Sequence, residues 1–492
     1  MQLHERILEL ALTRSFFFPA NEPYNPSAGF YEYGPVGVLI KHKIEDLWKK
    51  KFIKNEGFHE VETSIVTPEP ILIASGHVGS FADPVIECQK CKTRIRADTL
   101  VEEVHLSKHG ERWDGKLESL DKIVQEQNIK CPRCKGDFGK TFMFNLMFKT
   151  GIGSEQLPAY NRPETAQGIF TAFPRLYKNH GQKLPMAIGQ VGRSFRNEIS
   201  PRQGLVRMRE FTQMELEYFF DPEENTYPGF QDVAGDKIKL KVNEKIIESG
   251  AKESVDKKYS PNEIMSYFLV RQWEFYKQIG VDEKRMHLRV LDMAEVPHYS
   301  KGNIDMEIET SFGTIETIGN AYRTDYDLSS HAKQSGKDMS VFNNERKVVP
   351  HVVEVSMGVD RLFLALLEHC YREKTKEKDW EWFDFPPVVA PYHVAVFPLL
   401  KKDGHPEKAK EVTEKLRNAG LDVTYRESGS IGRRYARADE IGICYCLTID
   451  HDTLNDNTVT IRYRNDGKQE RVNIDDLEKA ISENVKKGRV TL

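Results

Sequence analysis

The sequence has no run of 18 or more apolar residues, which excludes a membrane-spanning helix of ordinary length. It also lacks a charge bias, since 71 Lys and Arg oppose 75 Asp and Glu and leave a formal net charge of −4. A nucleic-acid partner would therefore have to bind at a local basic patch rather than through the field of the whole molecule. The first 14 residues lack the long apolar segment of a secretory signal, so a cytoplasmic protein without a membrane partner is expected.

Cysteine is scarce, and the odd count of seven argues against a framework of disulfides in such a chain. Four cysteines form two Cys-x-x-Cys pairs, Cys88 with Cys91 and Cys131 with Cys134. This spacing is typical of a structural Zn²⁺ site with four thiolate ligands and no open coordination position. Four unrelated reduced thiols are the alternative. The 39 residues between Cys91 and Cys131 form a longer spacer than usual, so a subdomain is expected between the two pairs.

The length of 492 residues exceeds what one ordinary hydrophobic core supports, so several domains are expected. Pro386-Pro387 marks one boundary, and two stretches of altered composition indicate insertions. The expected division is a catalytic domain made of residues 1–86, 141–220 and 286–385, a cysteine-bounded insertion at 87–140, a mixed α/β insertion at 221–285, and a C-terminal unit at 388–492.

Hydrophobic periodicity places the main elements. It predicts helices over residues 35–56, 264–279 and 358–369, and strands over residues 58–66, 206–219, 306–317 and 352–357. Ser260, followed by Pro261 and Glu263, has the capping-box spacing expected at the start of the second helix. After residue 388, strand and helix patterns alternate, which predicts an α/β unit.

The predicted strand over residues 206–219 has two chemically different faces. One face carries apolar residues, among them Met208, Met214 and Leu216, which suit a core. The other face carries Arg207, Arg209, Phe211, Gln213, Glu215 and Glu217. An aromatic plane, guanidinium groups and carboxylates are the groups needed to hold a nucleotide and an ammonium together. A solvated strand face is the alternative interpretation.

Three segments in a fixed order resemble the signature motifs of class II aminoacyl-tRNA synthetases. They are the strand before Pro68, Arg196-Asn197-Glu198 with the strand that follows through Glu215, and Gly358-Val359-Asp360-Arg361 at a helix start. Four longer segments are similar to homodimeric glycyl-tRNA synthetases of the archaeal and eukaryotic type. These segments are residues 29–35 (GFYEYGP), 162–168 (RPETAQG), 194–202 (SFRNEISPR) and 324–328 (TDYDL). The resemblance covers most of the chain apart from roughly residues 100–130 and 225–285.

The resemblance implies an α+β catalytic domain with a mainly antiparallel sheet flanked by helices. A C-terminal α/β anticodon-binding domain and a small zinc-binding insertion complete the implied fold. The implied activity is that of a glycine–tRNA ligase, the ATP-dependent attachment of glycine to tRNA(Gly) through glycyl-adenylate. The implied partners are ATP, glycine, Mg²⁺, tRNA(Gly) and a second copy of the chain, with residues 35–56 and Pro68 at the dimer interface.

For the ATP site, the resemblance assigns catalysis to Arg196, Glu198 and Arg361. Arg196 would bridge the substrate carboxylate and the α-phosphate, Glu198 would read the adenine amino group, and Arg361 would reach the distal phosphate. Phe211 would stack under the base, and Glu316, followed here by Thr317, would hold Mg²⁺. The implied ATP-binding set is Arg196, Asn197, Glu198, Val206, Arg207, Met208, Arg209, Glu210, Phe211, Glu316, Thr317, Gly358, Val359, Asp360 and Arg361. The alternatives are an Arg196–Glu198 ion pair, a core role for Phe211 and a structural role for Glu316.

For the amino acid, the resemblance places Glu164 and Glu215 at the glycine ammonium, with Ser356 and Glu354 beside them. The implied glycine-binding set is Arg96, Glu164, Phe211, Thr212, Gln213, Met214, Glu215, Glu354 and Ser356. Two positions depart from the family pattern, because Val355 replaces a proline and Thr99 replaces a histidine.

In the C-terminal unit, Arg433, Arg434, Tyr435 and Arg437 are expected to bind tRNA, with a solvated helix face as the alternative. The whole chain has three alternative interpretations. They are a related class II synthetase for proline, threonine or serine, an inactive paralogue that binds nucleic acid, and a zinc-ribbon nucleic-acid binder fused to an unrelated enzyme. Amino-acid-dependent ATP–pyrophosphate exchange separates them.

Overall fold

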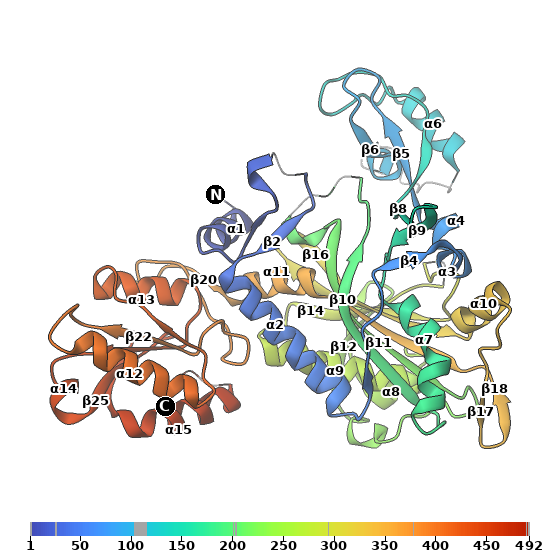
Figure 1. The fold of residues 1–492 in the computed structure, drawn as a ribbon. Helices are drawn as coiled ribbons and strands as arrows, with labels where there is room; N and C mark the ends of the chain where they lie inside the picture. The colour runs from blue at the N-terminus through green and yellow to red at the C-terminus, as the bar shows by residue number, and fades with distance from the viewer. Residues whose placement is uncertain are drawn as a thin grey trace.

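The computed structural model describes residues 2–24, 27–102, 116–199, 201, 204–293, 295–376, 378–488 and 490. Figure 1 shows a large body with a broad sheet, a small lobe above it and a C-terminal unit at its side. Within the described residues, no helix has the length and apolar character needed to cross a membrane. Ser200 and Arg202, which belong to one of the quoted motifs, lie outside the described residues.

A nine-stranded sheet is the framework of the large body. In spatial order its strands are β13 (Lys245–Gly250), β12 (Lys237–Val242), β14 (Met286–Val290), β15 (Asn303–Thr310), β16 (Gly313–Thr324), β19 (His351–Gly358), β11 (Glu210–Phe220), β10 (Met186–Phe195) and β3 (His59–Glu60). Neighbouring strands are antiparallel except in the β12–β14 and β10–β3 pairs. The mainly antiparallel sheet predicted for the catalytic domain is therefore confirmed.

Helices pack on both faces of this sheet. The core beside Met214 and Leu216 of β11 includes α1 (Leu3–Thr13), α2 (Pro35–Lys49), α9 (Glu263–Ile279) and α11 (Val359–Cys370). On the other face, α7 (Ala166–Asn179) and α10 (Tyr326–Ser335) pack near Phe219. Because alternate residues of a strand point in opposite directions, the odd-numbered polar residues of β11 lie on the face that α7 only partly covers.

Two predicted strands differ from the structure in extent. Residues 58–66 contain β3 and the start of β4 (Val66–Pro68) as separate strands, because β3 pairs with β10 whereas β4 pairs with β9 (Leu157–Asn161). Residues 306–317 span the β15–β16 hairpin, which reverses at Gly313 with a φ of +107°. The apolar alternation continues across that turn, so the periodicity of the sequence conceals it.

Two element starts are also corrected. The strand expected from residue 206 begins at Glu210, because Gly204–Val206 forms a short 3₁₀ helix. Helix α9 is capped by Asn262, whose side chain accepts a hydrogen bond from the Met265 amide at 2.8 Å. The capping box predicted from Ser260 is therefore wrong, and the Ser260 hydroxyl donates to the Asn262 carbonyl instead.

The stretch predicted as an insertion at 221–285 is continuous with the main body. Strands β12 and β13 extend the nine-stranded sheet, and α9 is buried in the principal core. The short α8 (Ala251–Asp256) packs against α9. This segment therefore adds two strands to one edge of the catalytic sheet.

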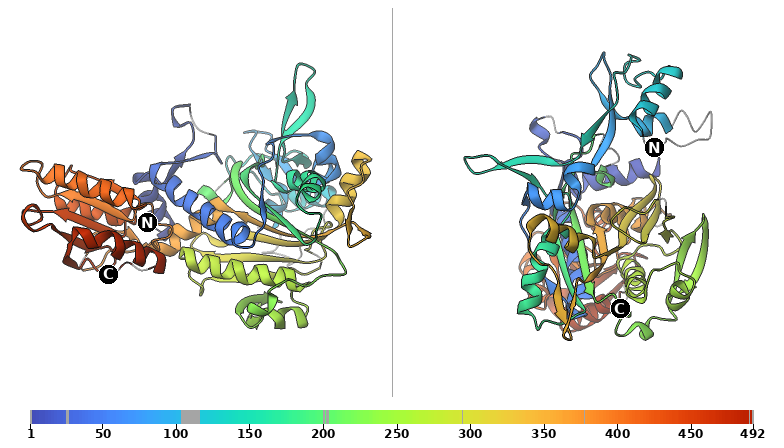
Figure 2. Two further views of the ribbon diagram at one scale, coloured as in Figure 1. Left: turned by 60° about the horizontal axis from the view of Figure 1, so that its bottom comes forward. Right: turned by 90° about the vertical axis from the view of Figure 1, so that its right-hand side faces the viewer.

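The small lobe is a three-stranded sheet with helix α6 (Leu117–Glu126) and a helical segment at residues 97–102. Its strands are β6 (Arg94–Arg96), β5 (Ala82–Glu87) and β7 (Phe142–Asn145). The sheet of the lobe therefore includes residues outside the predicted range 87–140, because β5 begins at Ala82 and β7 ends at Asn145. Beneath the lobe, β4, β9 and β8 (Phe148–Ile152) form a second sheet next to α3 (Glu69–Ala74) and α4 (His77–Ser80), and Figure 2 shows the β8–β9 hairpin standing out from the body.

The C-terminal unit has the predicted α/β character. Its sheet contains β23 (Val423–Tyr425), β22 (Val394–Pro398), β24 (Tyr445–Ile449), β25 (Thr458–Tyr463) and β26 (Gln469–Asn473), with helices α12 (His405–Asn418), α13 (Ile431–Glu440), α14 (Thr453–Asp456) and α15 (Ile474–Lys487). Three small hairpins lie elsewhere, formed by β1 (Phe17–Pro19) with β2 (Tyr31–Tyr33), β17 (Val341–Asn343) with β18 (Arg346–Val348), and β20 (Tyr371–Arg372) with β21 (Trp382–Phe383).

Candidate active site

A cavity of about 330 Å³ opens on the polar face of the central sheet, over β11, β16 and β19. Widely separated parts of the sequence meet in it. The predicted site residues that line the cavity are Glu164, Arg196, Glu198, Val206, Arg207, Met208, Phe211, Gln213, Glu215, Glu316, Thr317, Glu354, Ser356, Gly358, Asp360 and Arg361. Most of the predicted nucleotide and glycine residues are therefore gathered at one place.

The remaining predicted residues do not line the cavity. They are Arg96, Asn197, Arg209, Glu210, Thr212, Met214 and Val359. Met214 and Val359 are buried in the principal core, so their side chains do not face the cavity. Arg209 donates to the carbonyls of Glu198 and Ala28, a structural role. Arg96 lies in the small lobe, where it pairs with Asp83 at 3.1 Å and Asp98 at 2.5 Å.

One end of the cavity is built around Arg196. Its guanidinium lies 5.3 Å from the ring centroid of Phe211 and 5.4 Å from that of Phe81, and its Nε donates to the Pro163 carbonyl at 3.2 Å. Glu198 pairs with Arg207 at 3.8 Å, which argues against the Arg196–Glu198 ion pair considered as the alternative. Phe211 is half-buried and faces the cavity, which argues against a plain core role. An aromatic face and a cation are thus available to one ligand.

Arg361 closes the same end from the first turn of α11. Its Nε donates to the Val206 carbonyl and its Nη1 to the Glu316 carbonyl, both at 2.9 Å. Burial lowers the pKa of Arg361, although the guanidinium stays charged. The neighbouring Asp360 accepts hydrogen bonds from Tyr33 Oη and the Thr212 amide, both at 2.6 Å, so its carboxylate fixes the helix to β11.

Two carboxylates lie at the mouth of this end. The Glu316 carboxylate is half-exposed and 3.9 Å from Arg361. Asp305, on the paired strand β15, also lines the cavity, and both side chains reach the space above Gly319. Burial and the charges of Glu316 and Glu307 raise the pKa of Asp305 to about 8. Such a pair of hard oxygen donors fits a site for Mg²⁺.

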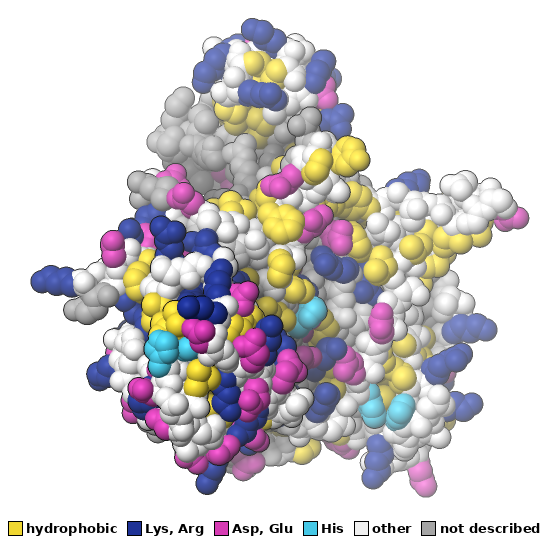
Figure 3. Space-filling view, turned by 60° about the vertical axis from the view of Figure 1, so that its left-hand side comes forward, with side chains coloured by type: hydrophobic (Ala, Val, Ile, Leu, Met, Phe, Trp, Pro, Cys, Tyr) yellow, Lys and Arg dark blue, Asp and Glu magenta, His cyan; other side chains and the backbone are white. Residues whose placement is uncertain are grey.

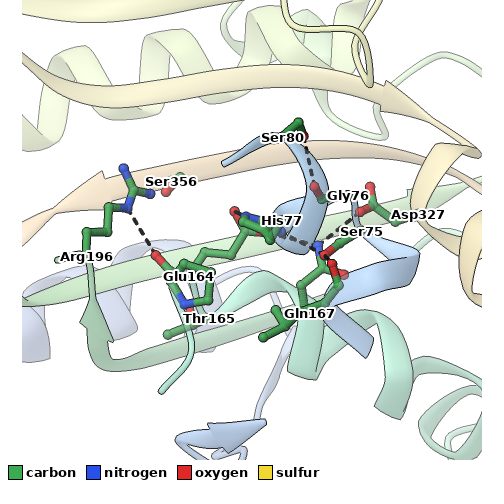
Figure 4. A network of polar contacts seen from close by, with 12 residues as sticks. Ser75, Gly76, His77, Ser80, Glu164, Thr165, Gln167, Arg196, Asp327 and Ser356 are labelled. Atoms are coloured by element: carbon green, nitrogen blue, oxygen red, sulfur yellow. Dashed lines mark hydrogen bonds and ion pairs between the residues drawn. The ribbon is translucent and has the colours of Figure 1, made fainter. Parts of the chain in front are cut away.

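The other end of the cavity is acidic, and Glu164 is its most strongly ionised group. His77 Nε2 lies 3.4 Å from the Glu164 carboxylate, Gln167 donates to it at 2.8 Å, and Ser75 holds His77 Nδ1 at 2.7 Å (Figure 4). Burial alone would raise the pKa of Glu164. His77 and Arg323 outweigh burial and hold that pKa below its usual range. Glu164 is therefore a carboxylate at neutral pH.

Glu215 projects from β11 toward the same space. It accepts hydrogen bonds from the hydroxyls of Thr165 and Ser356, the latter at 2.7 Å, and from the Gln213 amide at 2.8 Å. Burial raises the pKa of Glu215, and the nearby charge of Glu164 raises it further. An ammonium ligand between Glu164 and Glu215 would relieve that repulsion.

Behind these groups lies a buried network centred on Arg323. Its guanidinium donates to Asp327 at 2.7 and 2.8 Å and to Glu354 at 3.0 and 3.2 Å. Burial raises the pKa of Glu354 to about 8 despite this pairing. Glu217, directly opposite Glu354 on β11, is completely buried, and neither of its carboxyl oxygens has a hydrogen-bond partner among the described residues.

Comparison with known proteins decides the family. Residues 154–370 match the model of the tRNA synthetase class II core domain (G, H, P, S and T), and residues 393–484 match that of the anticodon binding domain. The chain is 38% identical to a glycine–tRNA ligase of Methanocaldococcus jannaschii, over 98% of this chain and 99% of that protein. It is 39% identical to the glycine–tRNA ligase of Pyrococcus abyssi, over 98% of each chain. The chain belongs to the glycine–tRNA ligase family.

Solved structures agree with this glycine–tRNA ligase family assignment at the level of the fold. A prolyl-tRNA synthetase from Cryptosporidium parvum, complexed with halofuginone and AMPPNP, superposes with a TM-score of 0.61 at 12% identity. The match covers 99% of this chain and 78% of the other. At that identity, the likeness shows a shared class II synthetase fold alone.

Some site residues of this family member escaped the sequence analysis. They are Leu205, Leu291, Pro297, Tyr299, Asn303, Asp305, Gly319, Ala321 and Arg323 in the cavity wall, with His77 behind it. Arg323 immediately precedes the quoted TDYDL segment, so its role in the site could have been predicted from that motif. Tyr299 comes from the loop before β15 and stacks on Arg323, with the ring centroid 4.3 Å from the guanidinium. No local pattern marks that loop.

The four paired cysteines of this glycine–tRNA ligase family member converge in the small lobe. All four sulfur atoms lie within 4.8 Å of one another, with Cys88 and Cys134 at 3.5 Å and Cys91 and Cys131 at 3.7 Å. Tetrahedral Zn–S bonds of about 2.3 Å place sulfur atoms about 3.8 Å apart, so the cluster fits a zinc ion. This convergence argues against four unrelated thiols.

The four residues predicted to bind tRNA occupy different environments on α13. Arg433 and Arg437 are exposed. Arg434 is buried, donates to the Pro398 carbonyl at 2.7 Å and lies over the Phe397 ring. Tyr435 is half-buried and its hydroxyl contacts Thr448 at 2.6 Å. Burial of Arg434 leaves Arg433 and Arg437 as the exposed cations of the predicted set.

Proposed function

We propose that this protein attaches glycine to tRNA(Gly) in an ATP-dependent reaction that passes through glycyl-adenylate. The observation that carries the proposal is one cavity with a cationic, aromatic end and an acidic end. Arg196, Phe211 and Arg361 suit a nucleotide, and Glu164 with Glu215 suits an ammonium. Membership of the glycine–tRNA ligase family supports the same reaction.

The proposed chemistry depends on positioning and charge. An oxygen of the glycine carboxylate attacks the α-phosphorus of ATP, and pyrophosphate leaves. The terminal ribose hydroxyl of the tRNA then attacks the adenylate carbonyl and AMP leaves. Arg196 is placed to neutralise the carboxylate and the α-phosphate together, while Arg361 and Glu198 hold the ends of the nucleotide. Mg²⁺, held by Glu316 with Asp305, would offset charge on the phosphates.

Selection of glycine rests on a small acidic pocket. Glu164 and Glu215 hold the ammonium, Ser356 fixes Glu215, and Arg323 with Glu354 closes the end. The ring of Tyr299 covers Arg323 and removes space that a side chain would need. A methyl group added to the amino acid would meet this wall. Such steric exclusion is needed because one methylene contact alone discriminates between amino acids by only about 1–3 kcal/mol. Glu217 remains outside this ligand set.

Glycine-dependent ATP–pyrophosphate exchange tests the function. The wild-type protein should support exchange with glycine and with no other amino acid. Glu164→Ala should abolish exchange because it removes the ionised partner of the ammonium. Glu248→Ala, on the distant edge strand β13, is the matched control and should retain wild-type exchange. Exchange with another amino acid, or undiminished exchange in Glu164→Ala, would overturn the assignment.

We further propose that the cysteine cluster holds structural Zn²⁺. Its four thiolates would complete the coordination shell, so the metal would hold the two knuckles together and take no part in catalysis. Elemental analysis should find one zinc per chain. Protein without zinc and with four freely titrating thiols would contradict this. Reduced thiols agree with a proposed cytosolic location, and all seven cysteines are free in the structure.

A symmetric homodimer and the expected domain division also remain proposals. The sheet of β4, β8 and β9 exposes apolar side chains that a second copy would cover. They are Ile65, Val66, Ile152 and Leu157, each more than one-third exposed. Arg433 and Arg437 on the exposed side of α13 support tRNA binding by the C-terminal unit.

A further inference from the structure

One side of Glu164 is held by a histidine that has no part in the proposed reaction. His77 is the first residue of the short helix α4, and its Nε2 lies 3.4 Å from the Glu164 carboxylate. Both side chains are nearly buried, with 13% of His77 and 12% of Glu164 exposed. Contacts between polar groups are stronger in such surroundings than in water. His77 is therefore placed to influence how Glu164 meets a ligand.

The groups around the imidazole fix its orientation. A carboxylate only accepts hydrogen bonds, so the Nε2 that faces Glu164 carries a hydrogen in the neutral as in the charged ring. Nδ1 lies 2.7 Å from the Ser75 hydroxyl, which is also 3.3 Å from the Leu72 carbonyl. This hydroxyl can donate to Nδ1 of a neutral ring, or it can accept from a charged ring and donate to Leu72. Ser75 therefore supports the same orientation in both protonation states.

Backbone contacts hold helix α4 in place. The Asn145 amide, at the end of β7, donates to the His77 carbonyl at 3.4 Å. The Ser80 hydroxyl donates to the Gly76 carbonyl at 2.8 Å (Figure 4). Gly76 precedes the helix with a φ of +85°, a conformation that glycine adopts without strain. The imidazole is therefore a fixed point that can orient the Glu164 carboxylate.

The two oxygens of Glu164 have different partners. Oε1 accepts from the Gln167 amide at 2.8 Å, and the same amide donates to Asp327 of the Arg323 network at 3.1 Å. Oε2 faces His77 at 3.4 Å, which is longer than a well-formed hydrogen bond. The imidazole thus orients this oxygen and leaves it with acceptor capacity for an ammonium group.

We propose that His77 is a positioning residue for the ammonium group of glycine, an inference that rests on the proposed function. His77 is not among the described residues that line the cavity, so it acts through Glu164. A lysine in its place would present a competing ammonium, and an arginine would bind both carboxylate oxygens. A single imidazole donor orients the carboxylate and leaves it charged for the ligand. Binding of ATP does not depend on this contact.

The test is glycine-dependent pyrophosphate exchange with variants of the full chain at position 77. His77→Ala should raise the KM for glycine about 10-fold, as expected for loss of a hydrogen bond to a charged group, with kcat and the KM for ATP unchanged. His77→Gln places an amide donor near the position of Nε2 and should return the KM for glycine to within about threefold of the wild-type value. An unchanged KM for glycine in His77→Ala, or no recovery in His77→Gln, would overturn the proposal.

A second variant tests the same contact without an empty space at position 77. Ser75→Ala removes the hydroxyl beside Nδ1 and should raise the KM for glycine about threefold, as expected for loss of one neutral hydrogen bond. The same change should have no effect in the His77→Gln background, because glutamine has no atom equivalent to Nδ1. Equal effects of Ser75→Ala in both backgrounds would contradict a role through the imidazole.

The control removes an imidazole far from the cavity. His451 is exposed on the C-terminal unit, which comes forward in Figure 3 and mixes Lys and Arg with Asp and Glu side chains on its surface. His451→Ala should retain the wild-type KM for glycine. An equal rise in this variant would show that the effect at position 77 is not local. Absence of glycine-dependent exchange in the wild type would instead refute the proposed function.

Discussion

At the scale of single residues, β11 presents two carboxyl groups on one face that differ in their hydrogen-bond partners. Glu215 lines the cavity and is held by hydroxyl and amide donors. Glu217, two residues further, is completely buried and has no hydrogen-bond partner in the described residues. Burial, together with the charge of Glu354, raises the pKa of Glu217 well above its usual range, which favours the neutral acid.

The same substitution at these two positions should therefore have different results. Glu215→Gln removes a charge from the ammonium site and should lower kcat/KM for glycine by about 100-fold, as expected for loss of one partner of a buried charge pair. Glu217→Gln replaces a neutral acid with a neutral amide of the same shape and should change kcat/KM by no more than about threefold. Steady-state pyrophosphate exchange at pH 7 measures both. Equal losses would mean that Glu217 is ionised and reaches the glycine.

The pKa of Glu217 also predicts how stability depends on pH. The unfolded chain loses this proton near the ordinary glutamate pKa of about 4.3, whereas the folded chain retains it to a much higher pH. The stabilisation from this proton is complete below the unfolded pKa of about 4.3, and it declines as the pH rises from there toward the folded pKa. Glu217→Gln has no such proton. Its melting temperature should exceed that of the wild type at pH 8.5, and this excess should shrink at pH 5.

Differential scanning fluorimetry at both pH values checks this expectation, with Glu248→Gln on exposed β13 as the control. An excess of the same size at both pH values would show that packing, rather than protonation, distinguishes the variant.

At the scale of elements, the sequence was most informative where one period dominates. The apolar run of β19 followed by α11, and the amphipathic α2, were predictable from their periodicity. Helix α2 ends in a π-helical turn at Lys50–Lys54, which still lies within the predicted range. Prediction failed where a tertiary contact overrides the local pattern, as in the separate strands β3 and β4, whose partners belong to different sheets.

Prediction of the site residues also succeeded for local motifs and failed for contacts that only the fold creates. Residues in local motifs, such as Arg196 and Arg361, were found from the sequence and line the cavity. Asp305 and Tyr299 were missed because they come from a strand and a loop without a motif, and only the folded sheet brings them to the cavity. Met214 was included from the motif, although strand alternation turns its side chain into the core.

The β15–β16 hairpin allows a prediction at this scale. Gly313 has a φ of +107° and no atom within 4 Å of an added Cβ, so a side chain there meets backbone strain without steric contact. Gly313→Ala should lower the free energy of unfolding by about 1–2 kcal/mol, measured by urea denaturation. Gly235→Ala is the matched control, because it also has open space but lacks the positive φ. Equal stability of both variants would contradict the expectation.

At the scale of the whole molecule, the site and the exposed apolar sheet lie close together in the sequence. Strand β4 leads from the edge strand β3 toward α3 and the lobe, and β9 leads directly to Arg162 and Glu164. Arg162 binds Thr63 at 2.9 Å and the Arg193 carbonyl at 2.7 Å, so the β4–β9 region supports the acidic end of the cavity. A partner subunit that covers this sheet would stabilise the segment that positions Glu164.

This arrangement predicts that dimerisation and glycine activation are coupled. Val66→Asp with Leu157→Asp introduces charge at side chains that are 44% and 54% exposed in one chain. Sedimentation velocity should show the wild type as a dimer and the variant as a single chain of 56.7 kDa. The variant should also have a higher KM for glycine, because the β4–β9 sheet would lose its cover. Ile246→Asp, 52% exposed on the opposite edge of the central sheet, is the control and should remain dimeric. A dimeric Val66 and Leu157 variant would place the subunit interface on another face of the molecule.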